Sequence, residues 1–262
     1  MIVDSHVNLH SEQYEGEVDE IIARARAAGV DVMLTISDKL SSTPAITQIV
    51  DAYPFIWRSL GVHPHYAKEH ADLTAQTLID LCDEDKVVGV GECGLDFYYE
   101  YSDREAQLPV FLAHIKAAQS TGLPLIIHTR DADELMLNTL VDEHAREAFM
   151  PLLHCYTSGP DLAQATLALG GYISFSGIIT FKNADDVRAI VQMAPLDRII
   201  IETDCPYLAP VPMRGRRNEP SYLPHVADKL AELKGVTRDE VDKVTTDNFF
   251  RLFSRIDRSV AI

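Results

Sequence analysis

Short apolar segments recur along this chain, and between them the apolar residues repeat at helical spacing. The apolar segments are rich in valine and isoleucine and carry few charges, which is typical of strands covered on both faces. We therefore predict eight strands, over residues 2–5, 32–36, 55–60, 87–91, 125–128, 152–154, 172–176 and 199–202.

The intervening segments predict helices, and their ends carry the expected signals. Ser102 and Thr237 each have a glutamate three residues later, which is the spacing of a capping box. Glycines in AAGVDV, STGLPL and LGGYIS stand between a helix and the next strand, where a left-handed residue is favoured. We predict helices over residues 17–28, 73–84, 102–120, 133–148, 161–169, 184–193 and 221–233, and a last helix from Thr237.

Strands that alternate with helices predict a parallel sheet, and eight such strands can close into a barrel. The chain has 262 residues, close to the roughly 250 of a typical (β/α)₈ barrel. We predict an α/β fold of this kind, a TIM barrel in which residues 1–262 form a single domain. An open doubly wound sheet is the alternative, but no GxGxxG follows the first strand.

Composition and charge narrow the class of protein. A net charge of −17, from 23 basic and 40 acidic residues, favours solubility and opposes tight nonspecific binding to long nucleic acid. No apolar run reaches the roughly 18 residues of a membrane-spanning helix, and MIVDSHVNLH lacks the features of a signal peptide. We expect a cytoplasmic protein without membrane association, and we predict no stable protein partner.

Ionisable residues stand at the ends of six predicted strands: His6, His63, Glu92, His128, His154 and Asp204. In a parallel barrel these positions share the C-terminal rim, where active sites lie. Any one of them could be a core residue or a helix cap, but burying a converging set without a partner is costly. Imidazoles and carboxylates bind zinc, manganese or magnesium. We predict one or two such cations, held by His6, Glu92, His128, His154 and Asp204.

Three cysteines, Cys93, Cys155 and Cys205, each follow a predicted ligand. Neighbours along a strand point to opposite faces. We therefore expect these thiols to face the helix layer as small core residues and not to bind metal.

Several segments together resemble the TatD family of metal-dependent deoxyribonucleases: IVDSH, GVHPH, VGVGECGLDFYYE, PLIIHTRDA, LLHCYTSG, ISFSGIITFKNA and IETDCPYLAPVPMRGRRNEP. The matching order continues to TTDNFFRLF and covers almost the whole chain. The resemblance implies an amidohydrolase-like TIM barrel that hydrolyses DNA phosphodiesters with a metal-activated water, in several members as a 3′-to-5′ exonuclease on single strands. It also implies that His6 is the N-terminal ligand, Glu92 the bridging ligand, His128 and His154 second-metal ligands and Asp204 the strand-eight ligand.

One departure from the family pattern concerns the first strand. The family carries His-x-His there, whereas this chain has His6-Val7-Asn8, so Asn8 takes the place of the second ligand. An amide oxygen binds transition ions more weakly than imidazole does. The hypothesis is that the site of His6, Glu92 and Asp204 is weakened or holds a harder ion such as magnesium. His10 follows in the same alternation but is expected in the loop beyond the strand.

Further residues are candidates for catalysis and substrate binding. Asp204 is the candidate general base and Glu202 a supporting residue, while His63 is assigned to the substrate phosphate or the transition state, and His65 to substrate. The basic cluster Arg214, Arg216 and Arg217 could bind phosphates, although such runs are often solvated surface, and Arg130 is a weaker candidate. Phe97, Tyr98 and Tyr99 could stack on a base or pack at the barrel top.

Three functions remain open. The first is a TatD-like DNase, with DNA as the partner. The second is a hydrolase of a small phosphoester or amide with one functional metal site, which Asn8 and the charge of −17 favour. The third is a non-catalytic metal-binding scaffold, which the retained ligand set argues against.

Overall fold

The strands form one parallel sheet that follows chain order. The computed structural model describes residues 1–99 and 101–261, and every strand pairs with the next one along the chain. All eight predicted strands are confirmed as β1 (Ile2–Val7), β2 (Val30–Thr35), β3 (Ile56–Leu60), β4 (Val87–Asp96), β5 (Leu125–Arg130), β6 (Pro151–Leu153), β7 (Tyr172–Phe175) and β8 (Ile199–Ile201).

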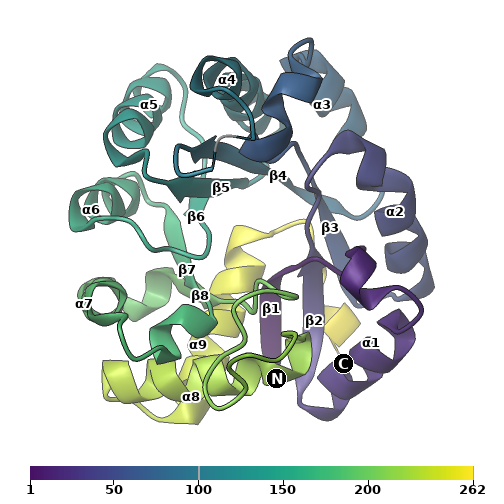
Figure 1. Ribbon diagram of the computed structural model, residues 1–262, viewed down its shortest axis with the longest axis vertical. Helices are drawn as coiled ribbons and strands as arrows, with labels where there is room; N and C mark the ends of the chain where they lie inside the picture. Colours follow the sequence, from purple (N-terminus) through teal and green to yellow (C-terminus); the bar gives the residue numbers. More distant parts are fainter. Residues whose placement is uncertain (100, 262) are drawn as a thin grey trace.

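The sheet curls into a barrel that is nearly closed (Figure 1). Its first and last strands meet through a bridge between Val7 and Cys205. Two backbone hydrogen bonds support this seam, because Asn8 N–H donates to Cys205 O at 3.0 Å and Asp204 N–H donates to His6 O at 3.0 Å. The predicted (β/α)₈ barrel is therefore confirmed.

Helices surround the barrel, as Figure 1 shows. They are α1 (Val18–Ala27), α2 (Thr43–Ala52), α3 (Ala75–Leu81), α4 (Arg104–Thr121), α5 (Asp133–Arg146), α6 (Pro160–Ala168), α7 (Asp185–Met193), α8 (Leu223–Lys234) and α9 (Arg238–Leu252). The sequence-based prediction omitted α2, which has a proline in its first turn. Proline is favoured in the first turn of a helix. Ile46 and Val50 are buried on the inner face of α2.

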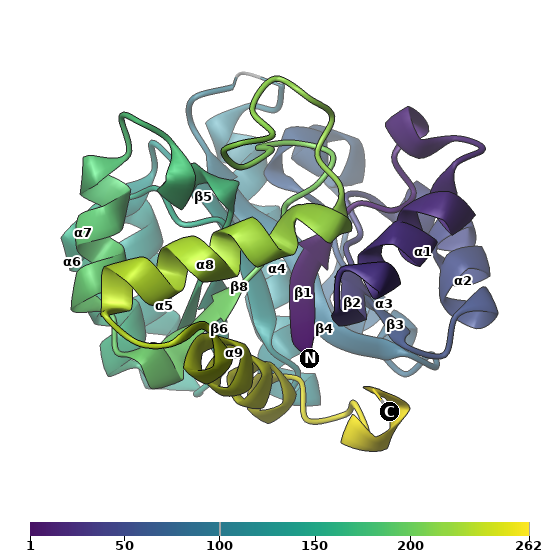
Figure 2. The same ribbon diagram turned by 90° about the horizontal axis from the view of Figure 1, so that it is seen from below.

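The core has two layers, which alternate along the strands. Ile2 and Met33 belong to the outer cluster, between sheet and helices, whereas Val3 and Leu34 belong to a second cluster inside the barrel. Residues of α9 complete this inner cluster, among them Phe249. Figure 2 shows α9 across the end of the barrel that carries the N-terminus, opposite the long loop after β8. The base of the barrel is thus closed by apolar packing, and the polar strand ends lie at the other rim.

The expected helix signals have mixed outcomes. The Thr237 hydroxyl accepts a hydrogen bond from Glu240 N–H, as predicted. The capping role of Ser102 is wrong, because α4 begins two residues later and the Ser102 hydroxyl donates to His65 O at 2.8 Å. Gly122 ends α4 in the left-handed region with φ of 70°, as its position in the sequence predicts. Within the described residues, each helix is too short or too polar to cross a membrane.

Candidate metal centre

The Glu92 carboxylate, on β4, stands at the middle of four imidazoles contributed by other strand ends. Its Oε1 lies 2.7 Å from His154 Nε2, 3.3 Å from His63 Nε2 and 3.3 Å from His128 Nδ1. Its Oε2 lies 3.2 Å from His6 Nε2. The strand ends predicted to converge therefore do so around one buried carboxylate.

Close approach of β4 to β5 brings Glu92 to this place. A Cβ atom on Gly94 would lie 2.0 Å from His128 O, and φ at Gly94 is 137°, so only glycine suits this position. The register of the two strands shifts between Val90 and Cys93, on either side of Glu92. The glycines of VGVGECGLD thus allow the local backbone that carries the central carboxylate.

Asp204 reaches the centre from the turn after β8. Its backbone is left-handed, with φ of 56°, and its Oδ1 lies 3.8 Å from His6 Nε2. The buried Asp4 carboxylate holds this turn by accepting from Thr203 N–H at 2.9 Å and from the Thr203 hydroxyl at 2.6 Å. Strained residues persist where surrounding contacts hold them in place, often at functional sites.

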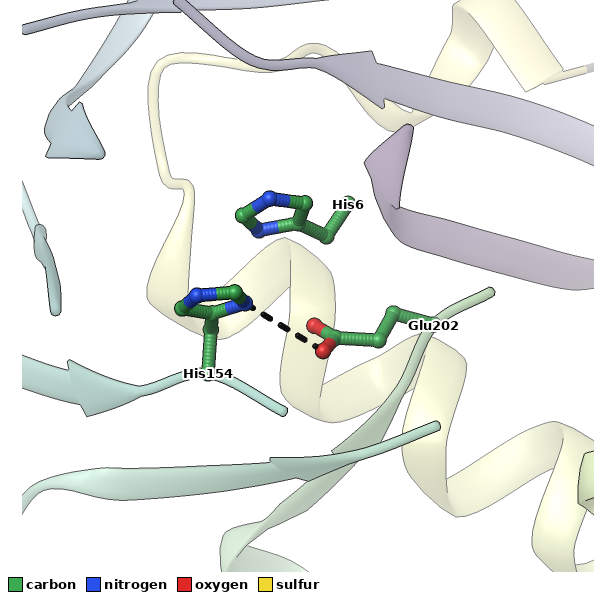
Figure 3. Close-up of side chains that lie close together, drawn as sticks. All are labelled: His6, His154 and Glu202. Carbon is green, nitrogen blue, oxygen red and sulfur yellow. Dashed lines mark ion pairs between the residues drawn. The ribbon is translucent and has the colours of Figure 1, made fainter. Parts of the chain in front are cut away.

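Glu202 supports the centre from beneath. Its Oε1 lies 3.4 Å from His154 Nδ1 (Figure 3), and its Oε2 accepts from the Ser174 hydroxyl at 2.5 Å. In Figure 3 the rings of His6 and His154 lie one above the other, and their centroids are 4.0 Å apart. Glu202 therefore lies beside the proposed ligand His154, and its supporting role stays a prediction.

The donor set fits divalent metal. Potential ligand atoms lie within 4.8 Å of one another in two groups: His6, His154 and Glu202, and His63, Glu92 and His128. Both ring nitrogens of His6 and of His154 are buried, and their contacts with the carboxylates of Glu92 and Glu202 lack hydrogen-bond geometry. Buried polar atoms are normally satisfied, so these nitrogens favour an additional ligand. The grouping also makes His63 a candidate ligand, a role that the sequence analysis did not assign to it.

Burial and charge shift the pKa values of this centre in opposite directions. Burial alone would raise the pKa of Glu92, but the four histidines hold it well below its usual value. Burial would likewise lower the pKa of His154, yet Glu92 and Glu202 raise it well above the usual range. Burial raises the pKa of Asp204 to about 6 and lowers the pKa of His63 to about 4. Metal ligands must be deprotonated, so metal binding here would displace protons.

Asp96 is a supporting residue that the sequence analysis missed. Its Oδ2 lies 3.0 Å from His128 Nε2 and 2.8 Å from His65 Nε2, and its Oδ1 accepts from Tyr98 N–H and Tyr99 N–H. The predicted strand stopped at residue 91, whereas β4 runs to Asp96. Extended alternation from Glu92 would have placed Asp96 on the same face.

The metal centre opens into a cavity of about 1800 Å³. Asn8 and His10 both line it. Asn8 Nδ2 donates to Cys205 O at 3.1 Å, which leaves its amide oxygen as the candidate ligand atom. His10 Nε2 lies 3.1 Å from Asp38 Oδ1, so the His10 imidazole pairs with Asp38 and does not take the position of Asn8.

The basic cluster of the β8 loop lies elsewhere. Among the described residues, the cavity lining does not include Arg214, Arg216 or Arg217. The Arg214 guanidinium stacks 3.8 Å from the Phe181 ring, Arg217 Nη2 donates to Glu17 Oε2 at 2.6 Å, and Arg216 is exposed. Two of the three arginines are therefore engaged within the protein.

The expected orientation of the cysteines holds at two positions and is wrong at one. Cys93 and Cys205 are buried in the outer core cluster, as predicted. Cys155 instead lines the cavity, with its Sγ 3.1 Å from Ser176 Oγ. The reason is that β6 ends at Leu153 and φ at Cys155 is 43°, which interrupts the strand alternation.

Comparison with known proteins agrees with this geometry. The TatD related DNase family matches residues 3–254. The chain is 41% identical to YcfH of Escherichia coli (strain K12), an uncharacterized metal-dependent hydrolase, over 98% of this chain and 97% of that protein. It is 36% identical to the 3′-5′ ssDNA/RNA exonuclease TatD of Erwinia tasmaniensis, over 96% and 99% of the two chains.

Among solved structures, YJJV, a TatD homolog from Escherichia coli K12, superposes with a TM-score of 0.89 at 25% identity, covering 97% of this chain and 98% of that one. Sequence and structure therefore point to the same relatives, and both matches extend over nearly the whole barrel. The chain belongs to the TatD related DNase family of metal-dependent hydrolases.

Proposed function

We propose that this protein is an exonuclease that shortens single-stranded nucleic acid from its 3′ end. The observation that carries the proposal is the Glu92 carboxylate between four histidines at the floor of an open cavity. A relative at 36% identity bears the name of a 3′-5′ ssDNA/RNA exonuclease. The same strand ends carry the ligand set that the sequence resemblance implies.

The residues divide into two candidate sites that share Glu92. His6, Asp204 and the amide oxygen of Asn8 would complete one, and His128 and His154 the other, with His63 within reach. When bound, magnesium, manganese or zinc ions polarise the phosphoryl group and acidify water. Asp96 forms a hydrogen bond with the outer ring nitrogen of His128, and Glu202 lies 3.4 Å from that of His154, so both carboxylates help to orient the nitrogens that face Glu92.

Asp204 is the proposed general base. Its pKa of about 6 keeps the carboxylate ionised at neutral pH but basic enough to accept a proton from the attacking water at Oδ. The His63 imidazole, with its pKa of about 4, is neutral at the same pH and can donate a hydrogen bond to a phosphate oxygen.

A second function, hydrolysis of a small phosphoester or amide, is favoured by the charge of the cavity. Carboxylates line it beyond the metal centre, and they would repel a long polyanion: Glu12, Asp38, Asp131, Asp133 and Asp186. Asn8 adds to this alternative, because it could leave only one site fully functional.

The test compares short single-stranded DNA and RNA labelled at the 5′ or the 3′ end with small phosphoesters and amides. Each reaction is run with magnesium, manganese or zinc and with chelator. We expect a ladder that shortens from the 3′ end, requires metal and is abolished in His128→Ala. Turnover of small esters or amides with intact strands would instead establish the second function.

A further inference from the structure

Three tyrosines in the loop after β4 are exposed to solvent. The exposed fractions are 55% for Tyr98, 38% for Tyr99 and 57% for Tyr101. Exposure of several large aromatic side chains within one loop is costly for a free monomer and is typical of binding surfaces. Only two of them, Tyr99 and Tyr101, are among the residues that line the cavity of the metal centre.

The rings of Tyr99 and Tyr101 stack on each other at the cavity. They are nearly parallel, with an interplanar angle of 16° and centroids 5.4 Å apart. The His65 ring meets both edge-on, with centroid distances of 4.8 Å to Tyr101 and 5.4 Å to Tyr99. We call Tyr99 and Tyr101 the tyrosine wall.

The wall is linked to the metal centre through partly buried hydrogen bonds. His65 Nε2 lies 2.8 Å from the Asp96 carboxylate oxygen that also contacts His128 Nε2. The same carboxylate accepts from Tyr99 N–H at 2.9 Å. One side chain therefore sets both the ligand His128 and the backbone that carries the wall.

The charged side chains that line the cavity favour base stacking as a source of substrate affinity. Among the described residues that line the cavity, the lysine and arginine residues are Lys39 and Arg130, and carboxylates outnumber them. Beyond the metal centre, side chains therefore offer little electrostatic attraction to phosphates, and aromatic stacking is the other general source of affinity for single strands. The Arg130 guanidinium lies 3.9 Å from the Tyr98 ring and 4.9 Å from the Tyr99 ring, where it could contact a phosphate of a stacked nucleotide.

We propose that the tyrosine wall is a nucleobase subsite, on which the base next to the scissile phosphate stacks while Arg130 contacts its backbone. This inference rests on the proposed nuclease function and deepens it. Stacking on a ring face does not read hydrogen-bonding edges, so the subsite accepts any of the bases and DNA or RNA alike.

The first test measures binding by fluorescence anisotropy in an Asp204→Asn background with magnesium, in which cleavage should be slow. The probes are a 5′-fluorescein single-stranded DNA and the same strand with abasic sites at its two 3′-terminal nucleotides. We expect about tenfold tighter binding of the normal strand, and loss of that preference in Tyr99→Ala and Tyr101→Ala. Tyr99→Phe and Tyr101→Phe should retain it. Tyr53→Ala is the control, because Tyr53 is a partly exposed tyrosine at the end of α2 and lies outside the cavity lining among the described residues.

Equal binding of the two strands, or retention of the preference in both alanine variants, would overturn the subsite. A second test separates the subsite from the proposed function by steady-state cleavage with the unsubstituted, magnesium-loaded protein. If the strand binds with base preference but is not shortened, the nuclease proposal fails and the subsite stands. If normal and abasic strands are shortened with the same KM, the nuclease function stands and the subsite fails.

Discussion

The carboxylate of Glu92 and the imidazole of His154 form the shortest histidine–carboxylate contact described for the metal centre, with Oε1 2.7 Å from Nε2 and both side chains buried. Three further histidines contact the same carboxylate. Because four imidazoles contact this one carboxylate, substitutions of Glu92 and of the residues around it test the metal centre most directly.

Glu92→Gln should reduce both metal content and activity. The amide removes a negative charge that both candidate sites share, so we expect kcat/KM to fall by more than about 100-fold. Metal per chain, measured by elemental analysis after dialysis, should fall in parallel. Asp185→Asn is the control, since this carboxylate is almost fully exposed on α7. Full metal content in Glu92→Gln would contradict the central role of this residue.

Asp96→Asn should impair His128 without unfolding the protein. Tyr98 N–H and Tyr99 N–H donate to Asp96 Oδ1, so the asparagine oxygen should stay there and its NH₂ should face His128 Nε2. His128 Nε2 must then accept, which puts the proton on Nδ1, the nitrogen that faces Glu92. We expect metal affinity to fall by about 10–100-fold, measured by competition with a chromophoric chelator. Unchanged affinity with an unchanged circular dichroism spectrum would exclude this positioning role.

Asn8→His should strengthen the site of His6, Glu92 and Asp204. Imidazole is a better zinc ligand than an amide oxygen, so zinc bound per chain should increase and its dissociation should slow. Equilibrium dialysis against zinc gives the stoichiometry, and His10→Asn serves as the control at the neighbouring histidine. Two tightly bound zinc ions in the unsubstituted protein would show that Asn8 does not weaken the site.

Arg217 can be tested as a loop anchor against its predicted role in phosphate binding. It pairs with Glu17, and both side chains are partly exposed. An exposed ion pair contributes little to stability, so if Arg217 is an anchor, Arg217→Ala and Glu17→Gln should have the same small effect on stability and KM. A phosphate-binding residue would raise KM in Arg217→Ala alone. The measurement is cleavage kinetics of both variants together with urea unfolding.

Acid should destabilise the barrel through His114, which is fully buried on α4. Its Nε2 accepts from Val62 N–H at 3.0 Å, and burial lowers its pKa from 6.5 to about 4. Between these values the unfolded chain binds a proton that the folded chain does not. The stability is therefore fully present above pH 6.5 and is lost as the pH falls below it.

The expected loss is on the order of 2 kcal/mol at pH 5. Urea unfolding at pH 7 and pH 5 measures it. His114→Gln keeps hydrogen-bonding groups but has no titratable proton, so its pH dependence should be shallower. His144→Gln, at a partly exposed histidine of α5, is the matched control. The same pH dependence in His114→Gln as in the unsubstituted protein would refute this assignment.

The pattern of apolar residues was sufficient to predict the barrel and its polar rim. A strand covered on both faces can be recognised from the apolar composition of a few neighbouring residues. The parallel strands of a barrel all end at the same rim. This is why His6, Glu92, His128, His154 and Asp204 could be brought together from positions almost 200 residues apart.

The partners of these side chains depended on the tertiary structure. Asp96 is found beside His65 and His128 only because β4 continues through glycines that let β5 approach, and Cys155 enters the cavity because its backbone is left-handed. Arg217 meets Glu17 across the fold instead of facing the cavity. The periodicity of apolar residues involves only residues that are close in sequence, and it therefore determines the helices and strands and their order. Backbone exceptions and contacts between distant segments depend on the closed barrel, and they decide which atoms meet.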